Sequence, residues 1–349
     1  MPITIIVGGQ YGSEGKGKVS HALAKEMGAS VAIRIGGPNS GHTVISPSGE
    51  SIIFKHLPTA AILPDVTCIL GAGSYINPDI LLAEIKVAGL SESRLIIDPN
   101  AAVITDAEIA EEQGSRLREE IGSTLSGTGA AVIKRIQRDG SLKLAKNDDR
   151  LAPYVQPSIS FMRSKLDKRE RVIIEGTQGY GLSLLHSPHY PFVTSRDTTA
   201  AGFLSEVGLG PRDVDDVVLV LRTFPIRVSG NSGPLSDEID WNKVTSEAGS
   251  ESQFIEFTSV TRTVRRIARF DVKIVRHAIA ANNPSRIVLN HLDYVDRNCA
   301  VLKSLTNSTT QFVQEVEANL GRAVDYYGFG QDLLINRQGN EIKMAKKWH

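Results

Sequence analysis

The chain has 349 residues, 41% of them hydrophobic, and its 39 Lys and Arg residues equal its 39 Asp and Glu residues, so the formal net charge is zero. This balance argues against a basic nucleic-acid-binding surface and against a polybasic membrane patch. Two cysteines, Cys68 and Cys299, are too few for a disulfide framework or a cysteine metal site, and no apolar run reaches the roughly 18 residues of a transmembrane helix.

The first predicted elements are a strand, a glycine-rich loop and a helix. Residues 3–7 form a continuous apolar run that predicts a strand, and the residues after Lys18 have the apolar spacing of a helix. Between them, residues 8–18 hold five glycines and the cations Lys16 and Lys18. Glycine lets backbone N–H groups approach an anion closely, and a helix N-terminus adds a favourable dipole. The stretch therefore predicts a phosphate-binding loop.

This loop departs from the standard phosphate-binding motifs. The P-loop reads G-x4-G-K-[ST]. Here five residues separate Gly9 from Gly15, and Gly17 stands where a Mg²⁺-binding Ser or Thr is expected. The G-x-G-x-x-G pattern does not match either. A glycine-rich turn without a ligand is the alternative, although two lysines in a tight turn would then repel each other.

The following elements repeat the order of apolar strand and polar loop. Strands are predicted at residues 31–35, 67–70 and 94–97, and a helix is predicted to begin near Pro78. A charged helix with a solvated face is predicted over residues 106–121. Residues 36–43 and 122–129 are too rich in glycine for a helix or strand interior and are predicted to be loops.

Continuous apolar strands recur in the second half of the chain. They are predicted at residues 171–174, 217–221 and 287–289, and polar turns follow at 175–179 and 290–293. Such strands between helices favour a buried, mostly parallel sheet, and open α/β sheets bind ligands at the C-terminal ends of their strands. Since no linker or repeat is evident, residues 1–349 are predicted to form a single α/β domain with insertions, with helices flanking a central, mostly parallel sheet.

Together these loops resemble those of the adenylosuccinate synthetase family. The family's G-Q-W-G-D-E-G-K-G-K loop is matched by residues 9–18, and its E-G-A-Q-G turn by residues 175–179. Further family segments match in the same order, at residues 36–43, 122–129, 190–195, 261–271 and 290–293. The resemblance covers nearly the whole chain and implies the fold of that family, a relative of the P-loop NTPases.

The resemblance implies a two-step ligase reaction. A nucleoside triphosphate phosphorylates the 6-oxygen of a purine nucleotide, and the amine of L-aspartate then displaces phosphate. Phosphate is a better leaving group than an unactivated 6-oxygen, and Mg²⁺ neutralises the transferring phosphoryl charge. A homodimer is also implied, because Arg138 matches an arginine that reaches the 5′-phosphate across the dimer interface, with Arg135 as the alternative. Neither nucleic acid nor membrane is expected as a partner, and the expected location is the cytoplasm, that of the host if the protein is viral.

The functional positions of the family carry over residue by residue. The implied catalytic residues are Ser13, Lys16, His42 and Gln178. The implied triphosphate site consists of Ser13, Gly15, Lys16, Gly17, Lys18, Gly41, His42, Thr43, Asn290, Asp293, Gly330 and Gln331. The implied purine monophosphate site consists of Ser13, Asn39, Ser123, Thr124, Arg138, Gln178, Thr194 and Thr263. The implied aspartate site consists of Val260, Thr261 and Arg265, and the implied Mg²⁺ ligands are Ser13 and Gly41.

Some of these residues also have a purely structural interpretation. A lone loop histidine usually just has its hydrogen bonds satisfied, but the Asn-Ser-Gly-His-Thr context of His42 favours a role at the 6-oxygen. Arg265 and Arg266 could form a basic, solvated turn. Asp293 could cap a turn after its strand instead of reading a nucleoside base. Residues 327–332 match the base-contacting loop of the family only loosely.

Four positions depart from the family pattern. Ser13 stands where the family has a catalytic Asp that takes the purine N1 proton, and a serine hydroxyl cannot act as that base unaided near neutral pH. Thr263 replaces an arginine that contacts the ribose and the incoming amino acid. His291 replaces the lysine of N-K-x-D, which packs on the guanine of GTP, and His21 replaces an acidic residue.

The first two departures together favour dGMP over IMP as the acceptor. Ser13 leaves room and a hydrogen-bond partner for a purine 2-amino group, and a sugar without a 2′-hydroxyl tolerates the loss of the arginine. This resembles the bacteriophage, PurZ-type branch of the family, which makes N6-succino-2-amino-2′-deoxyadenylate for genomes where 2-aminoadenine replaces adenine. His291 favours ATP or dATP over GTP. The alternatives are a compact synthetase using IMP, aspartate and GTP, and a catalytically inactive nucleotide-binding regulator.

Overall fold

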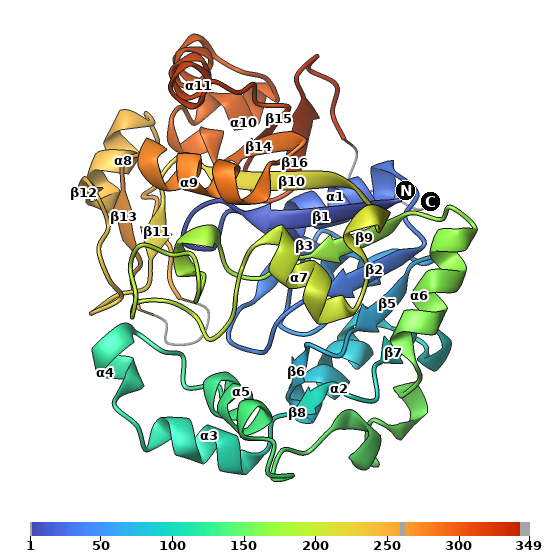
Figure 1. Ribbon diagram of the computed structural model, residues 1–349. Coiled ribbons are helices and arrows are strands. Elements are labelled where there is room, and N and C mark those ends of the chain that lie inside the picture. The colour runs from blue at the N-terminus through green and yellow to red at the C-terminus, as the bar shows by residue number, and fades with distance from the viewer. Residues whose placement is uncertain (1, 259–262, 343–349) are drawn as a thin grey trace.

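A nine-stranded sheet forms the centre of the computed structural model, which describes residues 2–258 and 263–342 (Figure 1). Across the sheet, its strands are β16 (Leu333–Asn336), β15 (Tyr326–Phe329), β14 (Arg286–Asn290), β10 (Val214–Arg222), β1 (Ile3–Gly8), β9 (Val172–Glu175), β2 (Val31–Arg34), β5 (Thr67–Leu70) and β7 (Leu95–Ile97). Neighbouring strands are parallel except for β15 and β16. This confirms the predicted α/β class with a mostly parallel sheet.

Helices cover both faces of this sheet because the central strands are apolar on both sides. Ile5 and Val7 of β1 pack in one core cluster with residues of α7 (Ala200–Val207) and α9 (Val272–Asn282). Ile6 faces the other way and packs against α1 (Lys16–Glu26). Figure 1 shows α7 and α9 on the near face of the sheet. The period of two along β1 therefore divides its side chains between two helical layers.

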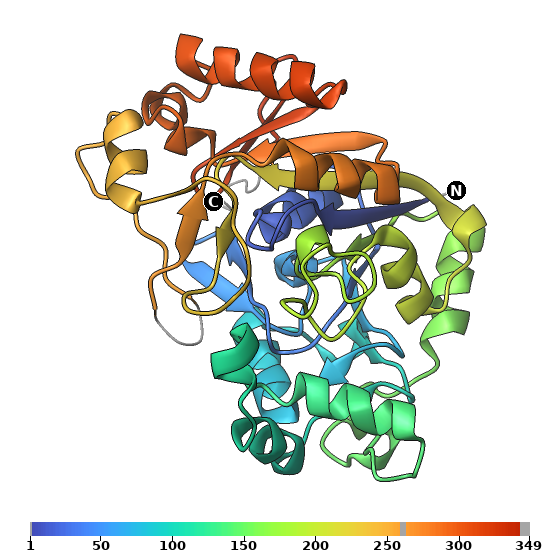
Figure 2. The same ribbon diagram turned by 60° about the vertical axis from the view of Figure 1, so that its left-hand side comes forward.

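The remaining helices lie at the ends of the sheet and in the insertions. They are α2 (Pro78–Ala88), α3 (Asp106–Gln113), α4 (Leu117–Ile121), α5 (Thr128–Gln137), α6 (Ser158–Asp167), α8 (Trp241–Glu247), α10 (Asn298–Leu302) and α11 (Asn307–Leu320). In both views α3, α4 and α5 lie together at one end of the molecule, away from α10 and α11 (Figures 1 and 2). None of the described helices is both long and apolar enough to cross a membrane.

Short strands and 3₁₀ turns complete the fold. The small sheets join β11 (Ile226–Arg227), β13 (Arg266–Ala268) and β12 (Glu238–Ile239), then β3 (His42–Ile45) with β4 (Ser51–Phe54), and β6 (Tyr75–Ile76) with β8 (Ala102–Val103). The 3₁₀ turns are η1 (Thr59–Ile62), η2 (Glu92–Arg94), η3 (Ala145–Asn147), η4 (Ala152–Tyr154), η5 (Tyr180–Leu182), η6 (Pro211–Asp213) and η7 (Leu292–Tyr294).

One expectation about local structure is wrong. Residues 106–121 do not form one solvated helix, because α3 ends before Gly114 and α4 is a separate short helix. Glu108 and Glu112 of α3 are buried. Glu108 accepts hydrogen bonds from Thr105. Glu112 accepts them from the backbone N–H groups of residues 127, 129 and 130. Strand β15 ends at Phe329, and Gly330 and Gln331 lie in the turn that follows it.

Candidate active site

Polar and charged residues gather at the C-terminal ends of the central strands. Arg34 ends β2, Glu175 ends β9, Arg222 ends β10 and Asn290 ends β14. In the pairing register Arg34 lies beside Glu175, and Arg222 lies beside Asn290. The first glycine loop leaves β1 between these two pairs. This edge of the sheet is where an open α/β fold places its ligands.

The buried carboxylate of Glu14 organises the first loop. Its Oε1 atom accepts hydrogen bonds from the backbone N–H groups of Gln10, at 3.2 Å, and Gly12, at 2.8 Å. Its Oε2 atom pairs with the Nζ atom of Lys16 at 2.6 Å, and both side chains are buried. An ammonium has three donors, so this pair leaves Lys16 two N–H groups for a phosphate.

The backbone of the first loop passes through left-handed conformations just before α1. Ser13 has a φ of 57° and an exposed side chain. Gly15 has a φ of 87°, and a Cβ atom there would lie 2.7 Å from Nδ2 of Asn290, so only glycine fits. Asn290 donates from Nδ2 to the carbonyl of Glu14 at 2.7 Å. Asn290 therefore braces the loop from β14.

The start of α1 packs against β3, which brings the first two glycine loops together. A Cβ atom on Gly17 would lie 2.9 Å from both the Cβ atom of His42 and the carbonyl of Thr43. Gly41 is half-buried just before β3, while the Thr43 side chain is exposed. These residues of the expected triphosphate site thus lie on adjoining backbone.

His42 lies in a buried cluster with Glu175 and Arg34. Its Nδ1 atom is 2.6 Å from Oε1 of Glu175, and its Nε2 atom is 2.9 Å from Nη1 of Arg34. The second carboxylate oxygen accepts from the backbone N–H of Thr59 at 2.9 Å and from its hydroxyl at 2.7 Å. The carboxylate is therefore fully hydrogen-bonded within the protein.

The charges of this cluster follow from its burial. Burial and the nearby Arg34 lower the pKa of His42 to about 3. Burial alone would raise the pKa of Glu175, but its hydrogen bond and charge interaction with His42 and the charge of Arg34 lower it to about 2. At neutral pH the carboxylate is ionised and the imidazole is neutral. Its one N–H then donates to Glu175 while Nε2 accepts from Arg34.

Residues expected at the purine monophosphate come from three segments. Asn39 donates from Nδ2 to the hydroxyl of Thr194 at 3.5 Å. Gln178 has a φ of 57°, and a Cβ atom built on Gly12 would lie 3.5 Å from its Oε1 atom. The Gln178 side chain therefore lies beside the residue that precedes Ser13. The structure thus brings Asn39 together with Thr194, and Gln178 together with the first loop.

The third glycine loop reaches the second one at the start of α5. A Cβ atom on Gly37 would lie 2.9 Å from the hydroxyl of Thr128. Ser123 accepts from the backbone N–H of Leu125 at 3.2 Å, and Thr124 donates to Ser126 at 3.4 Å. These are contacts within the loop, and they leave Ser123 and Thr124 half-exposed.

The two arginines considered for contact with a second subunit differ in their surroundings. Arg135 donates to the carbonyls of Ala72, at 2.8 Å, and Asn100, and its guanidinium lies 5.3 Å from the ring of Tyr75. Arg138 directly follows α5, is exposed, and donates to the nearby carbonyl of Ile136 at 3.1 Å. Of the two, Arg138 therefore has the more exposed side chain.

Asp293, Gly330 and Lys18 meet beyond β14. Asp293 is buried and accepts from the backbone N–H of Gly330 at 2.9 Å, and Lys18 donates to the carbonyl of Gly330 at 3.1 Å. Burial lowers the pKa of Lys18 to about 8, although Asp293 and Asp332 oppose this shift. Asp293 thus holds the turn that follows β15 rather than capping the turn after its own strand. Gln331 is exposed beside this group.

His291 points inward rather than presenting a free stacking face. Its backbone is left-handed, with a φ of 63°, and its ring lies 5.2 Å from that of Tyr294. Burial and the charge of Arg222 hold the pKa of His291 well below its usual value. A neutral imidazole packed on tyrosine offers less to a guanine base than the lysine of the family motif. His21 is buried on α1.

The expected aspartate site is only partly covered, because Val260 and Thr261 lie outside the described residues. Thr263 accepts from the hydroxyl of Ser229 at 2.7 Å. Arg265 donates from Nε to the carbonyl of Phe257 at 3.2 Å. Arg266 pairs with Glu238 through Nε at 2.9 Å and Nη2 at 2.7 Å. Arg266 is thus held by an ion pair, which leaves Arg265 as the better candidate to bind a carboxylate.

Four charged residues of the site were missed in the sequence: Glu14, Arg34, Arg222 and Glu256. Arg222 donates to the carbonyl of Ser13 at 3.0 Å and pairs with Glu256 at 2.6 Å. The available signal was a charged residue directly after an apolar strand, as at Arg34 and Arg222.

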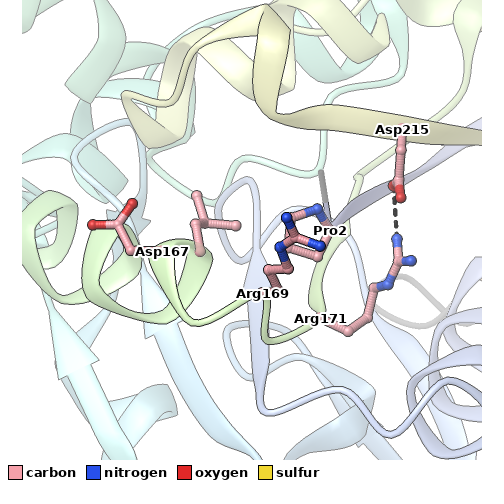
Figure 3. A pocket seen from close by; sticks show the side chains of 6 residues that line it. Pro2, Asp167, Arg169, Arg171 and Asp215 are labelled. Atoms are coloured by element: carbon pink, nitrogen blue, oxygen red, sulfur yellow. Dashed lines mark hydrogen bonds and ion pairs between the residues drawn. The ribbon is translucent and has the colours of Figure 1, made fainter.

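A cavity among the described residues lies away from this site (Figure 3). It measures about 510 Å³ and is lined by Pro2, Leu166, Asp167, Arg169, Arg171 and Asp215. Pro2, Arg171 and Asp215 lie at the starts of β1, β9 and β10, and Arg171 pairs with Asp215 at 2.7 Å. This is the sheet edge opposite the glycine loops, so the cavity is not part of the candidate site.

A family model and two archaeal relatives with similar sequences carry the same description. The adenylosuccinate synthetase family model matches residues 5–146 and 141–301. The adenylosuccinate synthetase of Methanocaldococcus jannaschii is 35% identical over 337 residues, covering 95% of this chain and 94% of the relative. That of Methanococcus aeolicus is 36% identical over 342 residues, covering 95% of this chain and 98% of the relative.

Two solved structures share the fold. One is the succinoaminodeoxyadenylate synthetase (PurZ) of cyanophage S-2L, bound to dGMP and to dATP as an energy donor. It superposes with a TM-score of 0.79 at 32% identity, covering 95% of this chain and 93% of that one. The other is the fully ligated adenylosuccinate synthetase of Plasmodium falciparum, with a TM-score of 0.82 at 20% identity, covering 97% of this chain and 100% of that one.

Proposed function

The chain belongs to the adenylosuccinate synthetase family and is a carbon–nitrogen ligase, and we propose that it joins L-aspartate to the 6-position of dGMP. The energy donor in this proposal is ATP or dATP, and the product is N6-succino-2-amino-2′-deoxyadenylate. Such a product would serve the synthesis of DNA that contains 2-aminoadenine. The reaction would take place in the cytoplasm, that of a host cell if the protein is viral.

The observation that carries this proposal is Ser13. Its side chain is exposed at the tip of a loop whose buried anchor, the Glu14–Lys16 pair, is intact. A hydroxyl at this position can hydrogen-bond a 2-amino group, whereas it cannot take the purine N1 proton unaided. The S-2L relative, which is bound to dGMP, supports the same acceptor.

The contacts of Thr263 support the proposal that the acceptor carries a deoxyribose. Its hydroxyl is 2.7 Å from that of Ser229, so this position presents short neutral groups where the family resemblance expects an arginine. A sugar without a 2′-hydroxyl has one polar group fewer to satisfy, so the loss of the arginine costs less binding energy.

The donor set near the first loop fits a magnesium ion that is held mainly by substrate. Among the described residues no cluster of three or more His, Cys, Asp or Glu side chains is placed to hold a metal. Mg²⁺ commonly keeps waters and binds through few protein oxygens together with phosphates. The exposed Ser13 hydroxyl and the backbone carbonyl of Gly41 would hold it. When bound, it would neutralise charge on the phosphates.

The remaining steps follow from the positions of the side chains. Lys16 and the N-terminus of α1 would bind the triphosphate, and the purine 6-oxygen would attack the γ-phosphorus to release the diphosphate. The aspartate amine would then form the bond to C6 as the C6–O bond breaks and phosphate leaves. Gln178 would orient the purine, Arg265 would bind a carboxylate of aspartate, and His42 would contact the 6-oxygen. The N1 proton would leave to water or to a phosphate oxygen.

The test is a phosphate-release assay with purified protein, Mg²⁺, aspartate, ATP and either dGMP or IMP. We expect turnover with dGMP and little with IMP. Strong turnover with IMP and none with dGMP would reject the proposal. It would favour the second candidate, a synthetase acting on IMP with GTP, which the identity to the archaeal synthetases supports. Replacing ATP by dATP or GTP in the same assay ranks the donors.

We also propose a homodimer in which Arg138 reaches the purine monophosphate of the partner subunit. Its exposure at the end of α5 supports this. Light scattering measures the oligomeric state. Mixing an Arg138→Ala subunit with a subunit inactivated at His42 tests whether the arginine acts across the interface.

A further inference from the structure

Arg222 and Glu256 form an ion pair beside the first loop. Nη2 of Arg222 lies 2.6 Å from Oε1 of Glu256, and Nη1 lies 3.4 Å from Oε2. The Arg222 side chain is fully buried. Burial alone would raise the pKa of Glu256, but the charge of Arg222 lowers it to about 2, so the carboxylate is ionised at neutral pH. Burying such a pair adds little stability and is better suited to fixing one arrangement.

Arg222 holds the first loop at two points. Its guanidinium donates from Nη1 to the carbonyl of Ser13 at 3.0 Å. Its backbone N–H donates to the side chain of Gln10 at 2.9 Å, and that side chain donates back to the Arg222 carbonyl at 3.0 Å. These hydrogen bonds fix the position of Ser13 relative to the end of β10.

Glu256 belongs to the segment that leads to the expected aspartate site. Its carbonyl accepts from the backbone N–H of Arg265 at 2.9 Å, and Phe257 and Val264 form an antiparallel bridge. Glu256 is therefore at the base of a hairpin stem that positions Arg265. Its Oε1 atom also accepts from the hydroxyl of Tyr294 at 3.0 Å, close to Asp293. One carboxylate joins three parts of the site.

We propose that Arg222 and Glu256 are positioning residues that hold the hairpin carrying Arg265 in register with Ser13. The amine of aspartate must approach C6 of a purine that rests on the first loop, and small errors in such placement reduce rates steeply. Arg222 contacts Ser13, and Glu256 lies at the start of the hairpin. The salt bridge between them therefore fixes the distance between Ser13 and the hairpin. The inference rests on the ligase activity proposed above and does not depend on which purine is the acceptor.

The test compares Glu256→Gln and Arg222→Lys with a matched control. Glu256→Gln keeps the shape but loses the charge, and Arg222→Lys cannot donate to Ser13 and to both carboxylate oxygens together. We expect the KM for aspartate to rise about tenfold and kcat to fall about tenfold, with the KM for triphosphate within about twofold, as a positioning error of this kind predicts. Glu247→Gln disrupts another Arg–Glu pair that is joined by two hydrogen bonds, the pair of Glu247 with Arg269. This variant should leave the kinetics unchanged.

A purely structural role makes a different prediction. It would lower the thermal midpoint and the yield of folded enzyme while leaving the KM for aspartate unchanged per folded molecule, and that result would overturn the proposal. Glu256→Asp retains the charge, so it is the variant to use if Glu256→Gln does not fold, and it should show an intermediate KM for aspartate. All assays use the purine monophosphate that the wild-type protein turns over. A wild type active only on IMP would therefore reject dGMP as the acceptor without affecting this test.

Discussion

Nδ1 of His42 lies 2.6 Å from Oε1 of Glu175, and this buried contact leaves the neutral imidazole with no second N–H for a substrate. For His42 to donate to the 6-oxygen, the ring must turn or gain a proton, and the carboxylate of Glu175 would stabilise the protonated ring. Glu175, itself fully buried, thus favours the protonated form of His42 against the opposing effects of burial and Arg34.

Replacing Glu175 with Gln should lower both activity and stability. The variant cannot stabilise a protonated His42, so kcat should fall by roughly 10²-fold, the size of a lost acid–base contribution. It also leaves Arg34 without its buried carboxylate, which costs about 3–5 kcal/mol. Steady-state kinetics and thermal unfolding measure the two effects. The control variant Asp213→Asn loses the half-exposed ion pair with Arg163. Its free energy of unfolding should fall by about 1 kcal/mol or less. A Glu175→Gln enzyme with wild-type kcat would contradict the role given to this contact.

Stability should fall in acid because of the same two residues. His42 has a folded pKa of about 3, below its ordinary 6.5, so the unfolded chain takes up a proton first as the pH falls below 6.5. Glu175 has a folded pKa of about 2 against an ordinary 4.5, and it acts in the same direction below pH 4.5. Urea unfolding at pH 7, 6, 5 and 4 should show a decreasing free energy of unfolding. His42→Gln should flatten this decrease between pH 6.5 and 4.5, and parallel curves for the two proteins would disprove the assignment.

Ser13→Asp should impair the use of dGMP more than the binding of triphosphate. Ser13 has a φ of 57°, a conformation that Asp and Asn tolerate, so the loop can keep its shape. A carboxylate is larger than the hydroxymethyl group and takes the room left for the 2-amino group, and it restores the group expected in the rest of the family. We expect kcat/KM for dGMP to fall at least about tenfold, with the KM for triphosphate changing by no more than about threefold.

Ser13→Asn is the matched neutral control for this change. It has the size of Asp without its charge, so a loss of dGMP turnover equal to that of Ser13→Asp would assign the effect to size, and a smaller loss would assign it to charge. Equal dGMP turnover in wild type and Ser13→Asp would show that Ser13 does not set the choice of acceptor.

The sequence predicted those parts of the fold and the site that depend on local pattern. Apolar runs located the central strands, and glycine clusters located the loops at their C-terminal ends. Long-range pairing was not predictable: Arg34 meets Glu175 across 141 positions, and Arg222 meets Glu256 across 34. A charged residue at the end of an apolar strand is a local signal, but the identity of its partner is not, because an ion pair of this kind exists only once the strands are aligned.

The wrong prediction for residues 106–121 also has its cause in contacts between distant segments. Residues 106–121 have enough charge and helix propensity to resemble one exposed helix. The structure instead buries Glu112, which accepts hydrogen bonds from backbone N–H groups at the start of α5, and breaks the helix near Gly114. Propensity cannot anticipate such a use of a buried carboxylate, because its donors belong to another element.

Lys18 should make triphosphate binding sensitive to pH above neutrality. Burial lowers its pKa to about 8, so its charge is lost as the pH rises from 7 to 9, and the attraction for phosphate is lost with it. The KM for triphosphate should then rise by up to about tenfold per pH unit above pH 8, the limit for one essential proton. Lys18→Arg keeps its charge over this range and should show a flat profile, even if its KM is higher throughout. The exposed Lys86→Arg should follow the wild-type profile. If wild type and Lys18→Arg show the same slope above pH 8, another group controls the binding of triphosphate.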